Sequence, residues 1–290
     1  MSDENDAGRR HSGPPDLRSR LGSDFALRLG SGLAMGAVAA FFTFSGAIPF
    51  TLLVVAATVL LSWEWGRLVH GQEGGVLIGV QVVTVALAAL LAAFEKVGLG
   101  LVILPIGAIL VSVLSLGRHS LFSALGVFYA GLPAVALIWL RSDSPLGLVA
   151  TVFVILIVVA SDTAGFLCGR LIGGAKLWPR LSPNKTWAGV AGALCASALI
   201  GALFWFAVDG ASPLRLAGVG ALLSIVAQAG DLFESAIERR FGAKDASQLI
   251  PGHGGVMDRV DGLAAVASAV GLMGLFVNVY APAYALLIGS

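Results

Sequence analysis

Long apolar runs recur along almost the whole chain and constrain its fold more than any other feature. An α-helix needs about 20 mostly apolar residues to cross the roughly 30 Å hydrocarbon core of a bilayer. The runs that meet this need are 26–44, 47–64, 75–94, 97–116, 120–140, 146–169, 187–208, 214–237 and 262–284. Only 12% of the 290 residues are charged, whereas a soluble domain carries about 25%. The sequence therefore predicts an all-α, polytopic membrane protein with about nine transmembrane helices.

The distribution of Lys and Arg indicates how the chain lies in the membrane. If the N-terminus is cytoplasmic, fifteen of the 18 Lys and Arg residues fall in inner segments, and only Lys96, Arg141 and Arg215 fall in outer ones. Cytoplasmic loops of membrane proteins carry such an excess. We therefore expect a multi-pass protein of the plasma (cytoplasmic) membrane with its N-terminus inside. Because nine is an odd number, the C-terminus is expected outside.

Polar residues divide the chain into three expected regions. Residues 1–24 are polar and contain several arginines, which predicts a disordered cytoplasmic tail. Residues 25–145 hold the N-terminal transmembrane helices. We interpret their few charged residues, which include Glu64, as anchors at the membrane interface, and we interpret Trp65 in the same way. Residues 146–290 concentrate their charges in two connections on the expected cytoplasmic face, where a single site could be assembled.

Carboxylates in and beside the later spans are candidate functional groups. Asp162 follows the apolar run 152–160, and a carboxylate so near the hydrocarbon is costly unless it has a function, an arginine partner or a capping role. Further along, the spacing of four polar residues places them on one face of a helix; they are Gln228, Asp231, Glu234 and Ser235. Lipid does not tolerate such a face, so we expect it to line a polar seam or a wet cleft.

A glycine-rich loop precedes the last span. Residues 251–262 read Pro-Gly-His-Gly-Gly-Val-Met-Asp-Arg-Val-Asp-Gly. Backbone N–H groups of such a loop can approach phosphate oxygens closely, and a plain turn is the alternative. Asp258 and Asp261 follow where the last helix is expected to start, and carboxylates there can hold a divalent cation. Carboxylates beside arginines are typical of phosphoryl or nucleotidyl transfer, with an ion-coupled transporter as the rival.

These segments together resemble the signature of the phosphatidate cytidylyltransferase family. Residues 235–245 and 250–261 follow its pattern of Ser, two residues, Lys-Arg, four residues, Lys-Asp, a spacer, Pro-x-His-Gly-Gly, two residues and Asp-Arg-x-Asp, at about a dozen positions. The lead-in 230–235, the segment at Asp162 and the residues 182–187, Ser-Pro-Asn-Lys-Thr-Trp, also look like the family. The resemblance covers roughly residues 150 to 270, so 146–290 is the expected catalytic region.

Two residues depart from the family pattern. Glu238 stands where the signature has its first Lys, and Ala188 stands where the family often has an acidic residue. Arg240 could replace the missing cation only if the helix ended near Arg239, because residues two apart on a helix point in different directions. The alternative is that Glu238 forms a salt bridge with Arg239 or Lys244.

The resemblance implies an enzyme that transfers a cytidylyl group from CTP to phosphatidate and releases CDP-diacylglycerol and pyrophosphate. It implies Mg²⁺ as cofactor, with a second cation left open. The implied metal ligands are Asp231, Asp258 and Asp261. The implied catalytic residues are Asp231, Lys244, His253, Asp258 and Arg259. The implied substrate contacts are Asp162, Ser182, Lys185, Arg239, Gly254 and Gly255.

The expected partners are CTP, phosphatidate and membrane lipids, with no nucleic acid, and a homodimer is left open. One alternative is a related nucleotidyl- or phosphotransferase acting on an isoprenoid lipid, because contacts with a lipid tail are diffuse apolar surface. Another is a cation-coupled transporter. A transporter needs polar groups near the midplane and access from both sides, whereas this chain concentrates its polar groups on one face.

Overall fold

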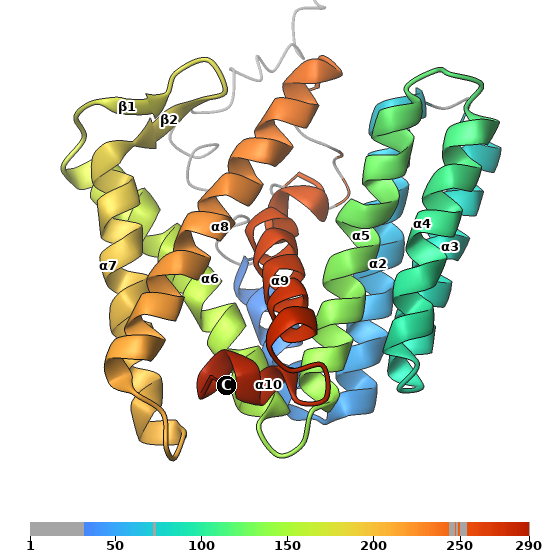
Figure 1. The fold of residues 1–290 in the computed structure, drawn as a ribbon. Coiled ribbons are helices and arrows are strands. Elements are labelled where there is room, and N and C mark those ends of the chain that lie inside the picture. The colour runs from blue at the N-terminus through green and yellow to red at the C-terminus, as the bar shows by residue number, and fades with distance from the viewer. Residues whose placement is uncertain (1–31, 72–73, 244–246, 248, 250–253, 290) are drawn as a thin grey trace, which may run out of the picture.

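The computed structural model describes residues 32–71, 74–243, 247, 249 and 254–289, which form a bundle of helices with one short hairpin (Figure 1). In chain order the elements are α2 (Ala47–His70), α3 (Gly75–Ala93), α4 (Val97–Leu114), α5 (Ser120–Ser142), α6 (Gly147–Leu171), β1 (Lys176–Trp178), β2 (Ser182–Thr186), α7 (Trp187–Leu203), the 3₁₀ turn η2 (Phe204–Ala207), α8 (Pro213–Arg240), α9 (Met257–Val277) and α10 (Pro282–Leu287). In this part of the chain, eight helices, α2 to α9, are long and apolar enough to cross a membrane. The expected all-α membrane fold is confirmed, and a helix suits lipid because it satisfies its own backbone groups.

Most of the expected spans coincide with these helices, and the two ends of the series differ. The first expected span, 26–44, is helical over Gly32–Phe44, and its other residues lie outside the described part, as does the expected tail 1–24. The last expected span, 262–284, is wrong at both ends. Helix α9 begins at Met257 and ends at Val277, because the Asn278 side chain accepts hydrogen bonds from two following N–H groups and turns the chain before Pro282.

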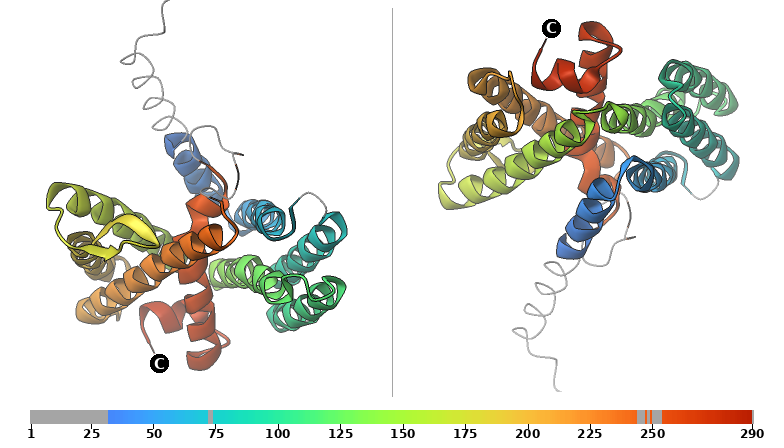
Figure 2. Two further views of the ribbon diagram at one scale, coloured as in Figure 1. Left: turned by 90° about the horizontal axis from the view of Figure 1, so that it is seen from above. Right: turned by 90° about the horizontal axis from the view of Figure 1, so that it is seen from below.

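Helix α9 lies between two groups of helices. It packs against α5 of the group α2–α5 and against α8 of the group α6–α8, while α10 packs against its C-terminal end (Figure 2). Two apolar cores follow this division: Trp65, Leu104 and Ile138 belong to the first, and Phe153 and Leu216 to the second. Residues at the start of α9 therefore contact both halves of the molecule.

Two residues of α2 correct the expectation of interfacial anchors. Glu64 and Trp65 are both 0% exposed. The indole Nε1 of Trp65 donates a hydrogen bond of 2.8 Å to the carbonyl oxygen of Phe122 on α5, and its ring stacks on Phe233 of α8. Both side chains therefore point into the bundle. Their partners lie in distant parts of the chain, which hydropathy does not reveal.

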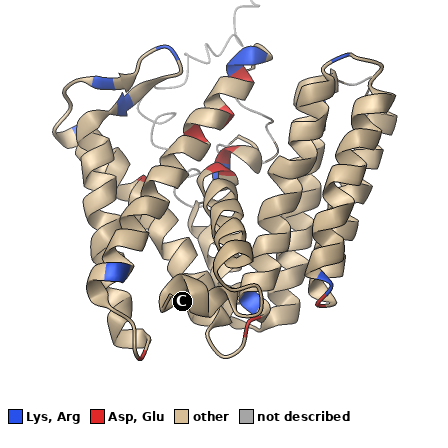
Figure 3. Ribbon diagram, viewed as in Figure 1, with Lys and Arg blue, Asp and Glu red and all other residues tan. Residues whose placement is uncertain are grey.

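Charged residues are distributed unequally between the two ends of the bundle. Lys and Arg gather on the β1–β2 hairpin and at the end of α8, with Asp and Glu just below them on α8 and α9 (Figure 3). Lys96, Arg141 and Arg215 lie at the opposite ends of their helices. The described residues therefore keep the asymmetry expected from the sequence, and the assignment of this polar end to the cytoplasm stays a prediction.

Candidate functional site

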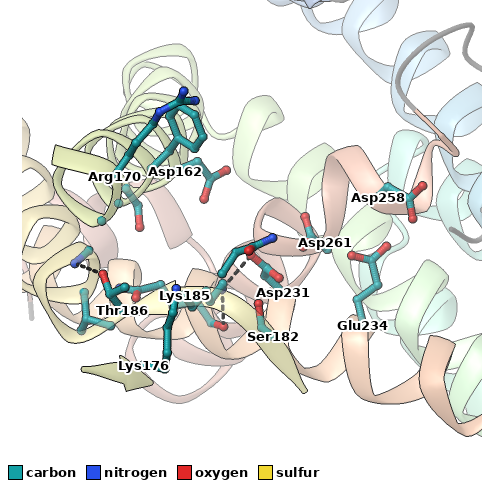
Figure 4. A pocket seen from close by; sticks show the side chains of 18 of the residues that line it. Asp162, Arg170, Lys176, Ser182, Lys185, Thr186, Asp231, Glu234, Asp258 and Asp261 are labelled. Atoms are coloured by element: carbon teal, nitrogen blue, oxygen red, sulfur yellow. Dashed lines mark hydrogen bonds and ion pairs between the residues drawn. The ribbon is translucent and has the colours of Figure 1, made fainter. Parts of the chain in front are cut away.

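A cavity of about 640 Å³ lies at the polar end of the bundle. Its walls are α6, the β1–β2 hairpin, the first turn of α7, α8 and the first turns of α9 (Figure 4). Carboxylates of α6, α8 and α9 line it together with cations from α6, the hairpin and α9. Both charge types therefore face one space, as a site for polyanionic substrates and a metal ion requires.

The face of α8 predicted from helical spacing lines this cavity. Gln228, Asp231 and Glu234 all contribute to its wall, whereas Ser235, expected on the same face, is not among its described lining residues. Asp231 Oδ2 lies 2.6 Å from Lys185 Nζ, with 37% and 21% of the respective side chains exposed. A pair this exposed contributes little to stability, so its importance lies in bringing a cation of the hairpin to a carboxylate of α8.

Two contacts hold the hairpin over the cavity, one at the end of β2 and one at the turn between the strands. Thr186 ends β2 and caps α7, where its Oγ1 accepts a hydrogen bond of 3.1 Å from the N–H of Gly189. Threonine is well suited to this role because its hydroxyl satisfies an otherwise unpaired N–H of the first turn. At the turn of the hairpin, Arg239 Nε donates to the carbonyl oxygen of Leu181. Ser182 and Lys185 on β2 are thereby fixed between α7 and α8.

A group of three acidic side chains lies where α8 meets α9. Glu234, Glu238 and Asp258 each offer a carboxylate oxygen, and these oxygens lie within 4.8 Å of one another. Glu234 is 6% exposed, and its Oε1 has no hydrogen-bond partner among the described residues. Carboxylate oxygens are the ligands that hard divalent cations prefer, so the donor set fits Mg²⁺.

The end of α8 bears on the two alternatives raised by Glu238. Helix α8 continues through Arg240, and the left-handed Gly242 (φ 70°) follows it. Glu238 and Arg240 therefore stay on one helix and point in different directions. Glu238 joins the acidic group. Helix α8 ends one residue after Arg239, and whether Arg240 supplies the missing cation stays a prediction.

The structure brings most of the predicted site residues together. Those that line the cavity are Asp162, Ser182, Lys185, Asp231, Asp258, Arg259 and Asp261. Arg239, Gly254 and Gly255 are not among its described lining residues. Lys244 and His253 lie outside the described residues. The role of each of these residues, including the metal ligands, stays a prediction.

Several residues of the cavity were not assigned from the sequence. Arg170 and Lys176 line it from α6 and β1. Both lie shortly before the Ser-Pro-Asn-Lys-Thr-Trp segment in the sequence, and this proximity was the available signal for including them in the site. Glu234 was placed on the correct face but given no role. Its spacing from Asp231 was the available signal, since two carboxylates one turn apart repel unless a cation lies between them.

Comparison with known proteins extends this picture beyond the signature. The model of the cytidylyltransferase family matches residues 26–277. A protein named phosphatidate cytidylyltransferase from Brucella suis biovar 1 (strain 1330) is 36% identical over 255 residues, which is 87% of this chain and 94% of that protein. One of the same name from Staphylococcus haemolyticus (strain JCSC1435) is 40% identical over 155 residues, 52% of this chain and 58% of that protein. The similarity thus includes α2 to α5, which the signature does not reach, and the chain belongs to the cytidylyltransferase family.

Proposed function

We propose that this chain transfers a cytidylyl group from CTP to phosphatidate, giving CDP-diacylglycerol and pyrophosphate for phospholipid biosynthesis. The observation that carries the proposal is the cavity in which carboxylates of α8 and α9 face cations of the hairpin, α6 and α9. The relatives that bear the name phosphatidate cytidylyltransferase support the choice of substrates.

The reaction needs charge neutralisation more than proton transfer. A phosphate oxygen of phosphatidate forms a bond to the α-phosphorus of CTP, and the bond from that phosphorus to the bridging oxygen breaks, so that pyrophosphate leaves with the electron pair. The nucleophile is already an anion, so no strong general base is required. The barrier arises from bringing two polyanions together, and preorganised cations lower it most effectively.

Cationic side chains of the cavity wall provide this neutralisation. Lys176 and Lys185 of the hairpin line the same cavity as the acidic face of α8, and Arg259 belongs to the first turn of α9. In this proposal Lys185 exchanges its contact with Asp231 for a phosphate oxygen when substrate binds. The 2.6 Å ion pair holds its ammonium in the cavity beforehand.

Carboxylates of the same wall are proposed to hold Mg²⁺. Asp258 and Glu234 lie in the acidic group, and Asp231 and Asp261 line the same cavity, so each is a candidate ligand. A bound Mg²⁺ would stabilise the negative charge on the transferring phosphoryl group and on the leaving pyrophosphate. The side chains of α8 and α9 would hold the ion between them, so the relative position of those two helices would matter.

The position of the cavity suits a substrate with one end in lipid. It lies at the end of the membrane-spanning helices, where a lipid head group would sit while its chains remain in the bilayer. We propose that this end faces the cytoplasm, because the excess of Lys and Arg lies there and CTP is a cytoplasmic nucleotide.

The test is turnover by the purified protein. It is reconstituted with radiolabelled CTP and phosphatidate, and lipid-soluble label is identified as CDP-diacylglycerol with Mg²⁺ and with EDTA. Parallel reactions contain a polyprenyl phosphate in place of phosphatidate. Product from phosphatidate that disappears with EDTA supports the proposal, while product from the isoprenoid lipid alone overturns the choice of lipid. Inactivity with both lipids, together with cation-dependent solute uptake in sealed vesicles, would favour a transporter instead.

A further inference from the structure

A buried carboxylate of the N-terminal half, Glu64, contacts the start of α9. Glu64 lies near the C-terminal end of α2, and it is 0% exposed. Burying a carboxylate is costly unless hydrogen bonds or opposite charges compensate. Within the described part of the chain no Lys or Arg pairs with it, so the compensation comes from hydrogen bonds.

The compensating partners are backbone groups at the beginning of α9. Glu64 Oε1 accepts a hydrogen bond of 2.9 Å from the N–H of Val256, and Oε2 accepts one of 2.7 Å from the N–H of Met257. Ser247 Oγ also donates to Oε1. The first N–H groups of a helix have no partner within it, and Val256 at the N-cap provides no side-chain hydrogen bond. Glu64 therefore caps α9 from another helix, and its charge lies favourably at the positive end of the helix dipole.

Gly255 permits this contact. A Cβ built on Gly255 would lie 2.7 Å from Glu64 Oε1 and 2.9 Å from Oε2. The N–H of Gly255 donates a hydrogen bond of 2.7 Å to Asp258 Oδ2, so three successive N–H groups are held by two carboxylates. The approach of Glu64 thus gives one physical reason for the second glycine of the His-Gly-Gly segment.

We infer that Glu64 is a positioning residue that sets where the first turn of α9 presents Asp258, Arg259 and Asp261 to the cavity. The consequence for catalysis rests on the proposed function, whereas the anchoring itself does not. Because these three side chains leave the helix within five residues of the capped N–H groups, a shift of this turn moves all of them together. The N-terminal half therefore takes part in the site through the Glu64 side chain.

The experiment compares two carboxylates that each cap a helix. Glu64→Gln keeps the size of the side chain. It replaces one carboxylate oxygen with an NH₂ group, which faces a backbone N–H and cannot accept a hydrogen bond from it. The matched control is Asp143→Asn, since Asp143 Oδ2 accepts a hydrogen bond of 2.7 Å from the N–H of Ala283 at α10, far from the cavity. For each protein kcat and KM are measured with CTP and phosphatidate, together with hydrogen–deuterium exchange of the peptide that contains Val256 and Met257.

A positioning role predicts a specific pattern. Glu64→Gln should lower kcat by roughly 10- to 100-fold, as loss of a residue that orients a metal ligand does. KM for phosphatidate should change by less than about threefold, because the binding of the lipid in the ground state is not altered. Exchange at residues 256 and 257 should become faster. Asp143→Asn should leave kcat and this exchange unchanged. A Glu64→Gln kcat within about twofold of wild type, or an equal loss in Asp143→Asn, would overturn the inference.

A second experiment perturbs the same contact from Gly255, with Glu64 itself unchanged, and a double-mutant cycle then tests the coupling. Gly255→Ala forces its new methyl group against the Glu64 carboxylate and should reproduce the loss of kcat. In a Glu64→Ala background the carboxylate is absent, so the same change should cost little more. Equal costs in both backgrounds would refute the coupling. If wild-type protein shows no turnover, the proposed function fails, and unchanged exchange at residues 256 and 257 in Glu64→Gln would then separately refute the anchoring.

Discussion

The crossing of α8 and α9 at Gly230 provides a quantitative test of how the carboxylates are placed. A Cβ built on Gly230 would lie 2.6 Å from the Cβ of Ala265 and 2.8 Å from the carbonyl oxygen of Asp261. Neither atom belongs to the far end of a flexible side chain, so Gly230→Ala has to move one helix away from the other. Ordinary contact begins at 3.4 Å, and the difference from 2.6 Å requires a local separation of about 0.8 Å.

A separation of this size acts directly on the cavity. Asp231 is the next residue after Gly230, and Asp261 provides the carbonyl oxygen that the new methyl group would meet. Misplacement by about 1 Å can cost on the order of 100-fold in rate, while overpacking typically costs about 1–3 kcal/mol of stability. We therefore expect Gly230→Ala to lower kcat for CDP-diacylglycerol formation by about 100-fold, with a reduced apparent Tm in a protein that still folds.

Two glycines of the same helix are matched controls. A Cβ on Gly220 would lie 2.4 Å from the carbonyl oxygen of Ser197 on α7, and a Cβ on Gly218 would have no neighbour within 4 Å. Gly220 is ten residues from Gly230, which is about 15 Å along the helix. Gly220→Ala should therefore lower the apparent Tm with less than a tenfold loss of kcat. Gly218→Ala should lower neither the apparent Tm nor kcat. Equal losses of kcat in Gly220→Ala and Gly230→Ala would refute the reasoning, because general destabilisation would then explain both.

Three further predictions concern charge and topology. Lys185→Gln should raise KM for CTP by roughly 10- to 100-fold through loss of a charge-assisted phosphate contact. It should change the free energy of unfolding by less than about 1 kcal/mol, because its pair with Asp231 is partly exposed to solvent. A Tm loss that parallels the KM change would contradict this. Asp258→Asn should abolish stimulation of turnover by Mg²⁺ in titrations where Asp209→Asn, at the opposite end of the bundle, behaves as wild type. In a background lacking Cys168 and Cys195, a membrane-impermeant maleimide should label Asp209→Cys in intact cells and Arg180→Cys only after permeabilisation, and the reverse pattern would show that the orientation is inverted.

The parts of the fold that depend on composition or on local periodicity could be predicted from the sequence. Apolar runs identify α2 to α8 within a few residues of their ends, apart from the last turns of α2, because lipid demands a continuous apolar surface from each helix separately. The placement of Asp231 and Glu234 on one face of α8 follows from helical spacing alone. Both predictions require no knowledge of what any helix contacts.

Other features depend on which helices meet and could not be predicted. Glu64 was interpreted as an interfacial anchor because its position near a span end permits that reading, and only the packing of α2 against the start of α9 shows its burial. Arg239 is expected at a phosphate because it belongs to the signature, and no local pattern indicates that its Nε also donates a hydrogen bond to the Leu181 carbonyl oxygen of the hairpin. The new partners lie 58 or more residues away in the sequence, beyond the reach of any local pattern.

The nature of the solvent explains why these long-range contacts decide the geometry of the site. Between helices in lipid the hydrophobic effect contributes little, since lipid chains are as apolar as the side chains they replace. Position must then come from close backbone packing and from polar contacts. In this chain Gly230 allows α8 to touch the backbone of α9, and Glu64 fixes the beginning of α9 against α2. These two constraints act on the same short helical segment from α8 and from α2, so the orientation of Asp258 and Asp261 is determined jointly by both halves of the molecule.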